Sequence, residues 1–211
     1  MGVIERRERA KQELRQQILD TARTMFAAEG YEAVTMRKIA DAIEYSPTAI
    51  YLYFKDKDEL INELCHADFR ALAHEFQKIA RVADPIERLK RAGLTYIEFG
   101  LTYPNHYRLM FMTPHPPHSP EIEMTKGNPE EDAYAFLKVI VGECVAKGIF
   151  REEFNDVEAV SQLLWAGVHG VVSLRVAKGG EDWVDWRPVK QLAEMMIDMQ
   201  LTGLLTDTKR A

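Results

Sequence analysis

Three histidines in one part of the chain could bind a metal ion. His106, His115 and His118 lie within thirteen residues of one another, and imidazole is a common ligand for zinc. No carboxylate or cysteine stands beside them at a convincing ligand spacing. His115 and His118 also fall in residues 113–127, a segment with four prolines and no apolar periodicity. We interpret that segment as a surface loop and expect neither a metal nor a cofactor.

Residues of the types found in a hydrolase triad occur further along the chain, at Asp156, Ser161 and His169. Nothing around them resembles a nucleophile elbow or a glycine-rich oxyanion turn, so we expect no enzyme of this kind. His169 lies beside Trp165 on a predominantly apolar helical segment. This setting favours a core or interface histidine over a general base.

The two cysteines, Cys65 and Cys144, form neither a disulfide framework nor a metal-binding spacing. Both lie in predicted helices without the adjacent basic cluster that would activate a thiol as a redox sensor. The charged N-terminus has no apolar core of a secretory signal, and no run of eighteen apolar residues predicts a membrane span. We expect a protein of the reducing cytoplasm.

The net charge of −6 is unevenly distributed along the chain. Residues 1–58 hold ten basic and ten acidic side chains, so the rest of the chain carries the whole negative charge. Several basic residues of this neutral part are clustered near its start: Arg6, Arg7, Arg9, Lys11 and Arg15. A local positive face of this kind suits contact with phosphates, although interspersed glutamates leave a solvated charged helix as the alternative.

The element that could use such a face lies between residues 35 and 64. Thr35 can cap a short helix, and Ser46 followed by Pro47 marks the start of another. The residues between them, Glu44 and Tyr45, leave room only for a tight turn. Two short helices joined in this way make a helix-turn-helix, whose second helix can enter the major groove of DNA. From spacing alone, an ordinary helical hairpin remains the alternative.

The residues around the end of the second short helix favour the helix-turn-helix over an ordinary helical hairpin. Residues 50–60, IYLYFKDKDEL, resemble the YxYF-x-x-K-x-x-L signature of the TetR family of bacterial transcription regulators. The resemblance extends back over Phe26, Gly30, Thr35, Ile39 and Ala40. It implies a helix-turn-helix DNA-binding domain at residues 1–58 and a linking helix at 57–81. The residues expected to contact DNA are Thr35, Arg37, Tyr45, Ser46, Pro47, Thr48, Tyr51, Tyr53 and Lys57.

One position departs from the family pattern. The turn commonly carries glycine where this chain has Glu44, and a small aliphatic residue where it has Tyr45. If the turn requires a positive φ, Glu44 costs on the order of 1 kcal/mol. We therefore expect the turn to differ slightly from the usual one.

Apolar periodicity and helix start signals predict an all-α chain with about nine helices. Besides the helix-turn-helix pair, we expect helices at about 11–28, 57–81, 84–103, 105–112, 128–148, 155–177 and 188–205. The third of these opens with Asp84, Pro85 and Glu87, which combine a cap, a proline and a reciprocal carboxylate. No convincing alternating strand pattern is present.

The second part, residues 59–211, also resembles a known type of domain. Residues 165–170, WAGVHG, match the Trp-x-x-x-His-Gly element of one class of TetR regulatory domains, and residues 103–111, YPNHYRLMF, resemble a further segment of that class. The resemblance implies a small-molecule site and a dimer interface formed by the last two helices. The candidate ligand-binding residues are Phe69, Phe76, Tyr96, Phe99, Tyr103, Tyr107, Phe111, Trp165 and His169. The candidate interface residues are Leu163, Leu164, Val168, Leu192, Met196 and Met199.

Together these patterns predict a homodimeric transcriptional regulator, most simply a repressor. We expect it to leave its palindromic operator when a small, largely apolar ligand binds. Two hypotheses from other classes remain at this point: a helical enzyme acting on a lipid-like substrate, and a protein-binding adaptor without a DNA role.

Overall fold

The computed structural model describes residues 2–114 and 126–206. These residues form nine α-helices, one short 3-10 helix and no β-strand, apart from an isolated bridge between Phe150 and Leu205. The predicted all-α class and helix number are confirmed. The helices are α1 (Val3–Glu29), α2 (Met36–Ala42), α3 (Pro47–Tyr51), α4 (Lys57–Gln77), α5 (Pro85–Thr102), α6 (Pro104–Phe111), α8 (Ala133–Ala146), η1 (Glu152–Phe154), α9 (Val157–Lys178) and α10 (Val189–Leu204).

The chain separates into two compact units. Unit 1 comprises Met1–Asp68 and Asn105–Met124, and unit 2 comprises Phe69–Pro104 and Thr125–Ala211. The division runs through α4, and α6 belongs to unit 1 although the helices before and after it belong to unit 2. The compact units therefore do not coincide with the predicted functional boundary after residue 58.

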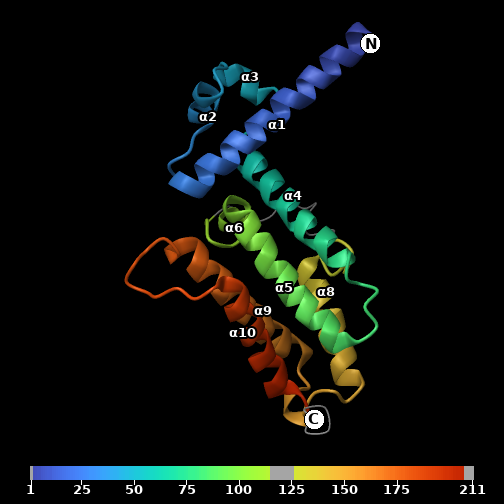
Figure 1. Ribbon diagram of the computed structural model, residues 1–211. Helices are drawn as coiled ribbons and strands as arrows, with labels where there is room; N and C mark the ends of the chain where they lie inside the picture. The colour runs from blue at the N-terminus through green and yellow to red at the C-terminus, as the bar shows by residue number, and fades with distance from the viewer. Residues whose placement is uncertain (1, 115–125, 207–211) are drawn as a thin grey trace. The chain divides into compact units, whose positions relative to one another are not determined.

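Unit 1 is built around the long helix α1, with α2 and α3 packed beside it (Figure 1). Its interior consists of buried side chains from these helices, from the residues just after α3 and from the first turns of α4: Ile18, Ala22, Phe26, Ile39, Ala40, Ile50, Phe54, Leu60 and Leu64. Their spacing of three or four residues along each helix is the periodicity that predicted the helices.

Side-chain caps set the starts of the short helices. Thr35 Oγ1 accepts a hydrogen bond from the Lys38 backbone N–H at 3.2 Å, and Ser46 Oγ accepts one from Ala49 N–H at 3.3 Å. Asp56 Oδ1 accepts from Glu59 N–H at 2.8 Å at the start of α4. Thr35 and Ser46 were predicted to start their helices, because each can satisfy an amide that the first helical turn leaves unpaired.

Three helix ends differ from the sequence prediction. Helix α1 begins at Val3 rather than near Lys11, because Glu5 accepts from the Gly2 N–H and helix formation needs no buried face there. Helix α4 ends at Gln77, where the chain tightens into turns with i to i+3 bonds. Helix α8 starts at Ala133 rather than near residue 128, because Asp132 caps it through Tyr134 N–H and Ala135 N–H.

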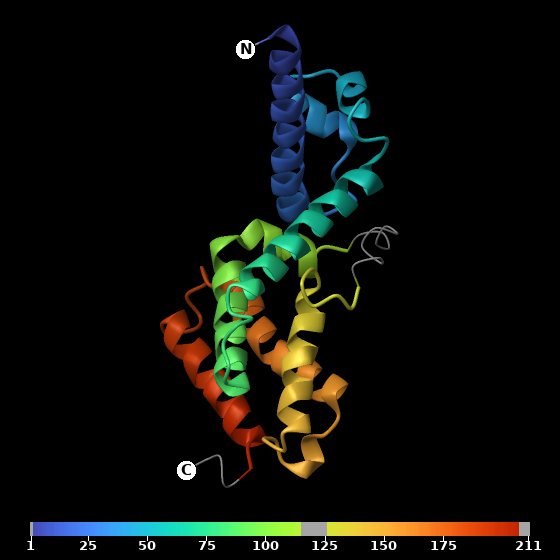
Figure 2. The same ribbon diagram turned by 90° about the vertical axis from the view of Figure 1, so that its right-hand side faces the viewer.

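Unit 2 is a bundle in which α5, α8, α9 and α10 run side by side (Figures 1 and 2). The bundle is tight where α5 meets α10, since a Cβ added at Gly93 would lie 2.8 Å from Ile197 Cδ1 and 3.4 Å from Val168 Cγ1. Two cross-helix ion pairs flank this core: Arg88 on α5 with Glu143 on α8, and Lys90 on α5 with Asp198 on α10 at 2.7 Å.

Among the described residues, α9 is the one helix that is long and apolar enough to cross a membrane by length and composition. It packs against α5, α8 and α10, and Ser161, Val168 and Val172 on it are buried. Helix α9 is therefore a core helix of the bundle, with further apolar side chains on its outer face.

Candidate functional site

The helix-turn-helix is held in place by inward side chains of α3 and of the residues just after it. Ile50 and Phe54, one helical turn apart, are buried, and the Arg15 guanidinium lies 5.1 Å from the centre of the Phe54 ring. With these two residues turned inward, the opposite side of α3 faces solvent. There Tyr51 is 53% exposed and Leu52 is 79% exposed.

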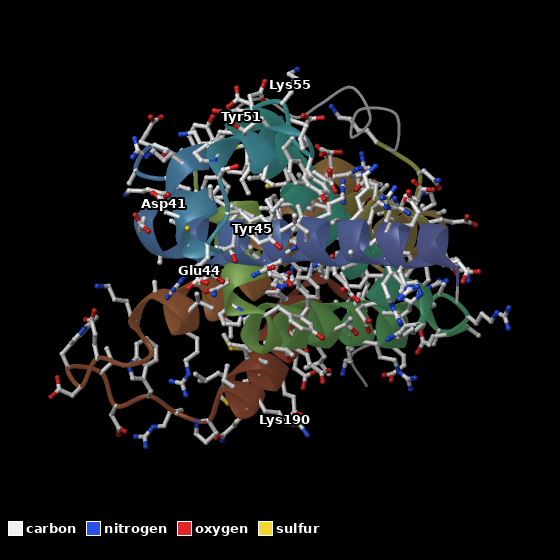
Figure 3. The ribbon with its side chains drawn as sticks, turned by 90° about the horizontal axis from the view of Figure 1, so that it is seen from above. Asp41, Glu44, Tyr45, Tyr51, Lys55 and Lys190 are labelled. Carbon is white, nitrogen blue, oxygen red and sulfur yellow. The ribbon has the colours of Figure 1, made fainter. Side chains whose placement is uncertain are left out.

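A basic residue that the sequence analysis did not select accompanies this exposed side. Lys55 lies between α3 and α4, and its side chain is 80% exposed, with Asp56 3.7 Å away. In Figure 3, Tyr51 and Lys55 project from the edge of unit 1 that faces away from α1. The position of Lys55 directly after the buried Phe54 could have indicated its exposure, because a residue next to an inward-facing side chain points outward.

The other predicted DNA contacts are divided between exposed and partly covered positions. Arg37 is exposed and lies 3.9 Å from Asp41, and Tyr45 is 45% exposed in the turn. Pro47 and Tyr53 are half-buried. The remaining exposed members of the predicted set are Thr35, Ser46 and Thr48.

Lys57 lies at the start of α4, but its ammonium group contacts its own chain. Lys57 Nζ donates to the Tyr31 carbonyl at 2.8 Å and lies 3.9 Å from the centre of the Tyr31 ring. The Tyr31 hydroxyl in turn bonds to Asp58, and burial together with that carboxylate raises the pKa of Tyr31. These contacts tie the loop after α1 to α4, so the predicted phosphate contact of Lys57 has an intramolecular competitor.

Glu44 adopts a left-handed backbone conformation, which the sequence analysis had left as one possibility for this turn. Its φ is +60°, and it is the one non-glycine residue with positive φ among those described. Tyr45 N–H then donates to the Ala40 carbonyl at 2.9 Å, closing the chain after α2. The turn therefore keeps the backbone geometry that glycine usually supplies, at the cost of steric strain at Glu44.

In unit 2, three of the candidate ligand-binding residues form a hydrogen-bonded chain. Trp165 Nε1–H donates to the Tyr96 hydroxyl at 3.1 Å, and that hydroxyl lies 3.2 Å from His169 Nδ1. Burial lowers the pKa of His169, which favours the neutral imidazole. In that form Nδ1 can accept the Tyr96 proton and Nε2 carries the hydrogen. The ring of Tyr134 lies 5.9 Å from that of Trp165, although the sequence analysis did not include Tyr134.

The nine candidate ligand-binding residues are divided between the two compact units. Tyr107 and Phe111 are in unit 1, where Tyr107 is completely buried and their rings lie 5.0 Å apart. The other seven are in unit 2. There Phe99 lies 5.4 Å from Tyr103, and Phe76 lies 5.4 Å from Phe136, a further aromatic residue that the sequence analysis missed.

The predicted dimer face shows a mixture of exposed and inward residues. Leu163 on α9 is 59% exposed and Met199 on α10 is 74% exposed. Val168 is buried and faces α5. Leu164, Leu192 and Met196 are half-buried. Two residues outside the predicted set, Leu174 on α9 and Met195 on α10, add further exposed apolar surface on the same helices.

Both cysteines are buried and unpaired, and burial raises the pKa of each thiol to about 12. The thiols are therefore protonated near neutral pH, which suits packing rather than redox chemistry. No group of three potential metal ligands occurs in residues 2–114 and 126–206. His115 and His118 lie outside the described residues.

Comparison with known families connects these observations. A model for "Bacterial regulatory proteins, tetR family" matches residues 18–64, and one for "Tetracyclin repressor-like, C-terminal domain" matches residues 89–200, more than half of the chain. The chain belongs to the tetR family. The first match includes the helix-turn-helix with the buried Ile50 and Phe54, and the second includes most of α5 and of the remaining bundle of this tetR-family protein.

Individual relatives agree with this assignment. The "Probable acrEF/envCD operon repressor" of Escherichia coli K12 is 35% identical over 88 residues, which are 39% of this chain and 40% of that protein. The "HTH-type transcriptional repressor KstR2" of Mycolicibacterium smegmatis is 27% identical over 154 residues, which are 71% of this chain and 73% of that protein. The chain thus spans well under two thirds of the Escherichia coli protein. The family and these relatives are regulators rather than enzymes.

Solved structures show the same fold. The tetR-family regulator PfmR from Thermus thermophilus superposes with a TM-score of 0.69 at 24% identity, covering 90% of this chain and 96% of that one. The ketosteroid transcriptional regulator KstR2 of Mycobacterium tuberculosis gives a TM-score of 0.66 at 21% identity, covering 92% and 95%. These similarities confirm the predicted architecture of an N-terminal helix-turn-helix and a C-terminal helical domain.

Proposed function

We propose that this tetR-family protein is a transcriptional repressor that binds a palindromic operator as a homodimer and leaves it when a small ligand binds. The observation that carries the proposal is the capped α2–α3 pair, in which Ile50 and Phe54 are buried while Tyr51 faces solvent. A short helix anchored on one side and exposed on the other has the form needed to enter a major groove.

The residues divide into two roles in this proposal. Residues 46–54 read base edges, with Tyr51 near the centre of the exposed side. Thr35, Arg37, Tyr53 and Lys57 contact phosphates, which position the protein but carry no sequence information. Lys55 joins the phosphate contacts because its ammonium is the more exposed of the two lysines around Asp56.

The dimer uses α9 and α10. One recognition helix covers too few base pairs for useful specificity, so two copies related by twofold symmetry read the two halves of a palindrome. Exposed Leu163 and Met199 supply apolar area on these two helices. Burial of such side chains against a second copy removes them from water, which is the main favourable term in association.

The ligand site lies in unit 2, in a regulatory domain of the Trp-x-x-x-His-Gly class. The hydrogen bonds from Trp165 to Tyr96 and from Tyr96 to His169 support a role for this element at the site. The ligand is largely apolar, because the candidate residues are mostly aromatic. The names of two similar proteins also mention apolar molecules: a ketosteroid regulator and a fatty acid degradation regulator from Bacillus halodurans.

Ligand and DNA are coupled through α4, which begins in unit 1 and ends in unit 2. The two recognition helices of a dimer must match successive major grooves, about 34–36 Å apart. A ligand that shifts α4 changes this spacing and weakens operator binding, and a coupling of about 1–3 kcal/mol is enough for a loss of about 5- to 150-fold. Such a regulator works in the cytoplasm, where its DNA is.

A salt-dependent mobility shift with the DNA next to the protein's own gene tests the DNA-binding proposal. The Lys55→Ala variant should weaken binding to all sequences alike and reduce the salt slope by about 1, because it removes one phosphate contact. Lys57→Ala makes the matched comparison. If Lys57 also contacts phosphate, the salt slope of Lys57→Ala falls by the same amount. An unchanged salt slope together with lower stability means that Lys57 contacts Tyr31 and not DNA. No binding at any salt concentration would reject the DNA role and leave an enzyme or an adaptor.

Titration of a ligand found by thermal-shift screening tests the coupling separately. Reciprocity requires operator DNA to weaken ligand binding by the same factor by which the ligand weakens DNA binding. Equal ligand affinity with and without operator would contradict the coupling while leaving DNA binding intact.

A further inference from the structure

Asp68 is the one charged residue that is buried among the described residues of unit 1. Asp68 is 2% exposed, and its carboxylate joins three helices. Arg23 of α1 donates to it through Nη2 at 2.9 Å and through Nε at 3.3 Å. His106 of α6 lies 2.9 Å away through Nδ1. Since an ionised carboxylate only accepts hydrogen bonds, His106 Nδ1 must carry the hydrogen in this pair.

The position of this pair in the chain is unusual. Asp68 is the last residue of unit 1 on α4, before the chain passes into unit 2 at Phe69. His106 follows the point where the chain returns to unit 1, since Pro104 belongs to unit 2 and Asn105 to unit 1. The hydrogen bond between them therefore joins two of the places where the chain passes from one unit to the other. Arg23 connects both to α1, the central helix of the DNA-binding unit.

Helix α6 belongs to unit 1 and also carries buried side chains, namely Tyr107, Leu109 and Met110. A movement of α6 cannot leave its surroundings unchanged, because a close-packed interior transmits displacement. The directional contact at Asp68 specifies where α6 engages α1 and α4.

We propose that His106 and Asp68 are positioning residues that form a latch between α6 and the α1–α4 pair, through which unit 2 sets the conformation of the DNA-binding unit. With the latch closed, α1, α4 and α6 move together. When ligand binding displaces the end of α5, the displacement is transmitted to α1 through His106, Asp68 and Arg23. The latch rests on the proposed DNA-binding function, but its structural part can be tested without DNA.

The chain offers a matched control for this contact. Arg15 of α1 and Glu63 of α4 form a second ion pair between the same two helices, at half-exposed positions. The Arg15–Glu63 ion pair does not involve His106. The Glu63→Gln variant thus weakens the α1–α4 contact while leaving the latch to α6 in place.

The first arm of the test is hydrogen–deuterium exchange of the full-length protein without DNA. His106→Leu should speed exchange at least about fivefold both in residues 105–111 and in the turns of α1 around Arg23. His106→Asn keeps a nitrogen donor near the position of Nδ1 and should restore near wild-type exchange in both places. Glu63→Gln should leave residues 105–111 unchanged. Equal exchange in wild type and His106→Leu, or equal effects of His106→Leu and Glu63→Gln on α6, would overturn the latch.

The second arm adds a duplex selected from random-sequence DNA by the purified wild-type protein. In wild type, the duplex should slow exchange in α6 as well as in α2 and α3. In His106→Leu, protection of α2 and α3 should persist while protection of α6 falls to less than half. If the duplex leaves α6 of the wild type unchanged, the latch is wrong whatever the variants do. Failure to select any duplex would count against the DNA-binding proposal, and the first arm would still decide whether the latch exists.

Discussion

At the scale of single residues, Glu44 has a strained backbone conformation in the short turn between α2 and α3. Its positive φ places Cβ close to the following carbonyl, a contact that glycine avoids. The turn between α2 and α3 spans few residues, so the conformation cannot be spread over a longer loop. The exposed carboxylate makes no contact that offsets this strain among those that the structure gives for unit 1.

Replacing Glu44 by glycine should therefore stabilise the protein. We expect Glu44→Gly to raise the free energy of unfolding by about 1 kcal/mol, from relief of the left-handed strain. Glu44→Ala is the matched control, because it removes the carboxylate but keeps Cβ and should show no such gain. Urea unfolding at a fixed protein concentration measures both, with the slope m unchanged. A gain of equal size in both variants would assign the effect to charge instead of backbone strain.

His169 makes stability depend on pH. Burial lowers its pKa in the folded protein, so the unfolded chain, with a pKa of about 6.5, binds the proton more readily. Its contribution to stability is complete above about pH 6.5 and is lost as pH falls through the folded pKa. The Tm of His169→Gln should fall less than that of wild type between about pH 7.5 and 5.5. Parallel Tm profiles for the two proteins would remove His169 as a source of the dependence.

At the scale of elements, the shortest helices depend most on their ends. Helix α3 has five residues, so few internal hydrogen bonds hold it, and its Ser46 cap is a large part of its local stabilisation. Packing of Ile50 and Phe54 supplies the remainder. The recognition helix is thus stabilised by one cap and two anchors rather than by helix propensity.

Loss of the cap should be measurable in both stability and DNA binding. Ser46→Ala should lower the free energy of unfolding by about 1 kcal/mol, because the Ala49 N–H loses its acceptor. Ser46→Thr retains a hydroxyl acceptor and should lose much less. Chemical unfolding gives the stability, and fluorescence anisotropy with an operator duplex gives the affinity. Were Ser46→Ala as stable as wild type, the Ala49 bond would not be the source of the capping energy.

At the scale of the whole molecule, the apolar outer faces of α9 and α10 require an explanation. Leu163, Leu174, Met195 and Met199 are all more than half exposed in the protomer. Large apolar side chains gathered on two neighbouring helices are typical of an interaction surface. The family assignment makes a second copy of the chain the natural partner, since homodimers are typical of this family.

Charged substitutions on this face should produce monomers. Met199→Glu and Leu163→Glu are preferable to changes at Leu164 or Met196, because these last two are half-buried within the protomer. Val139→Glu on α8 is the control, with an exposure of 54% on a helix outside the proposed interface. Sedimentation velocity should show monomers for the first two and a dimer for the control. Dimers in all three would place the interface elsewhere.

Much of this protein was determined by short-range patterns in its sequence. The caps at Thr35, Ser46 and Asp56 act within three residues, and the apolar periodicity of α1 and α3 acts within one or two turns. The sequence left the sign of φ at Glu44 open, and the structure gives a positive value. The family signature at residues 50–60 depends on the same local rules, so the sequence alone was sufficient for the fold class and the candidate DNA-binding face.

Long-range packing decided the rest. Whether Lys57 points at Tyr31 or away from it depends on a loop 26 residues distant, and whether Val168 faces outward depends on α5. The contact between Asp68 and His106 spans 38 residues, and no local periodicity indicates it. Likewise, only the tertiary structure assigns α6 to the DNA-binding unit. Local hydrogen bonds and periodicity specify where helices form, but the faces that meet are chosen by the packing of the whole chain.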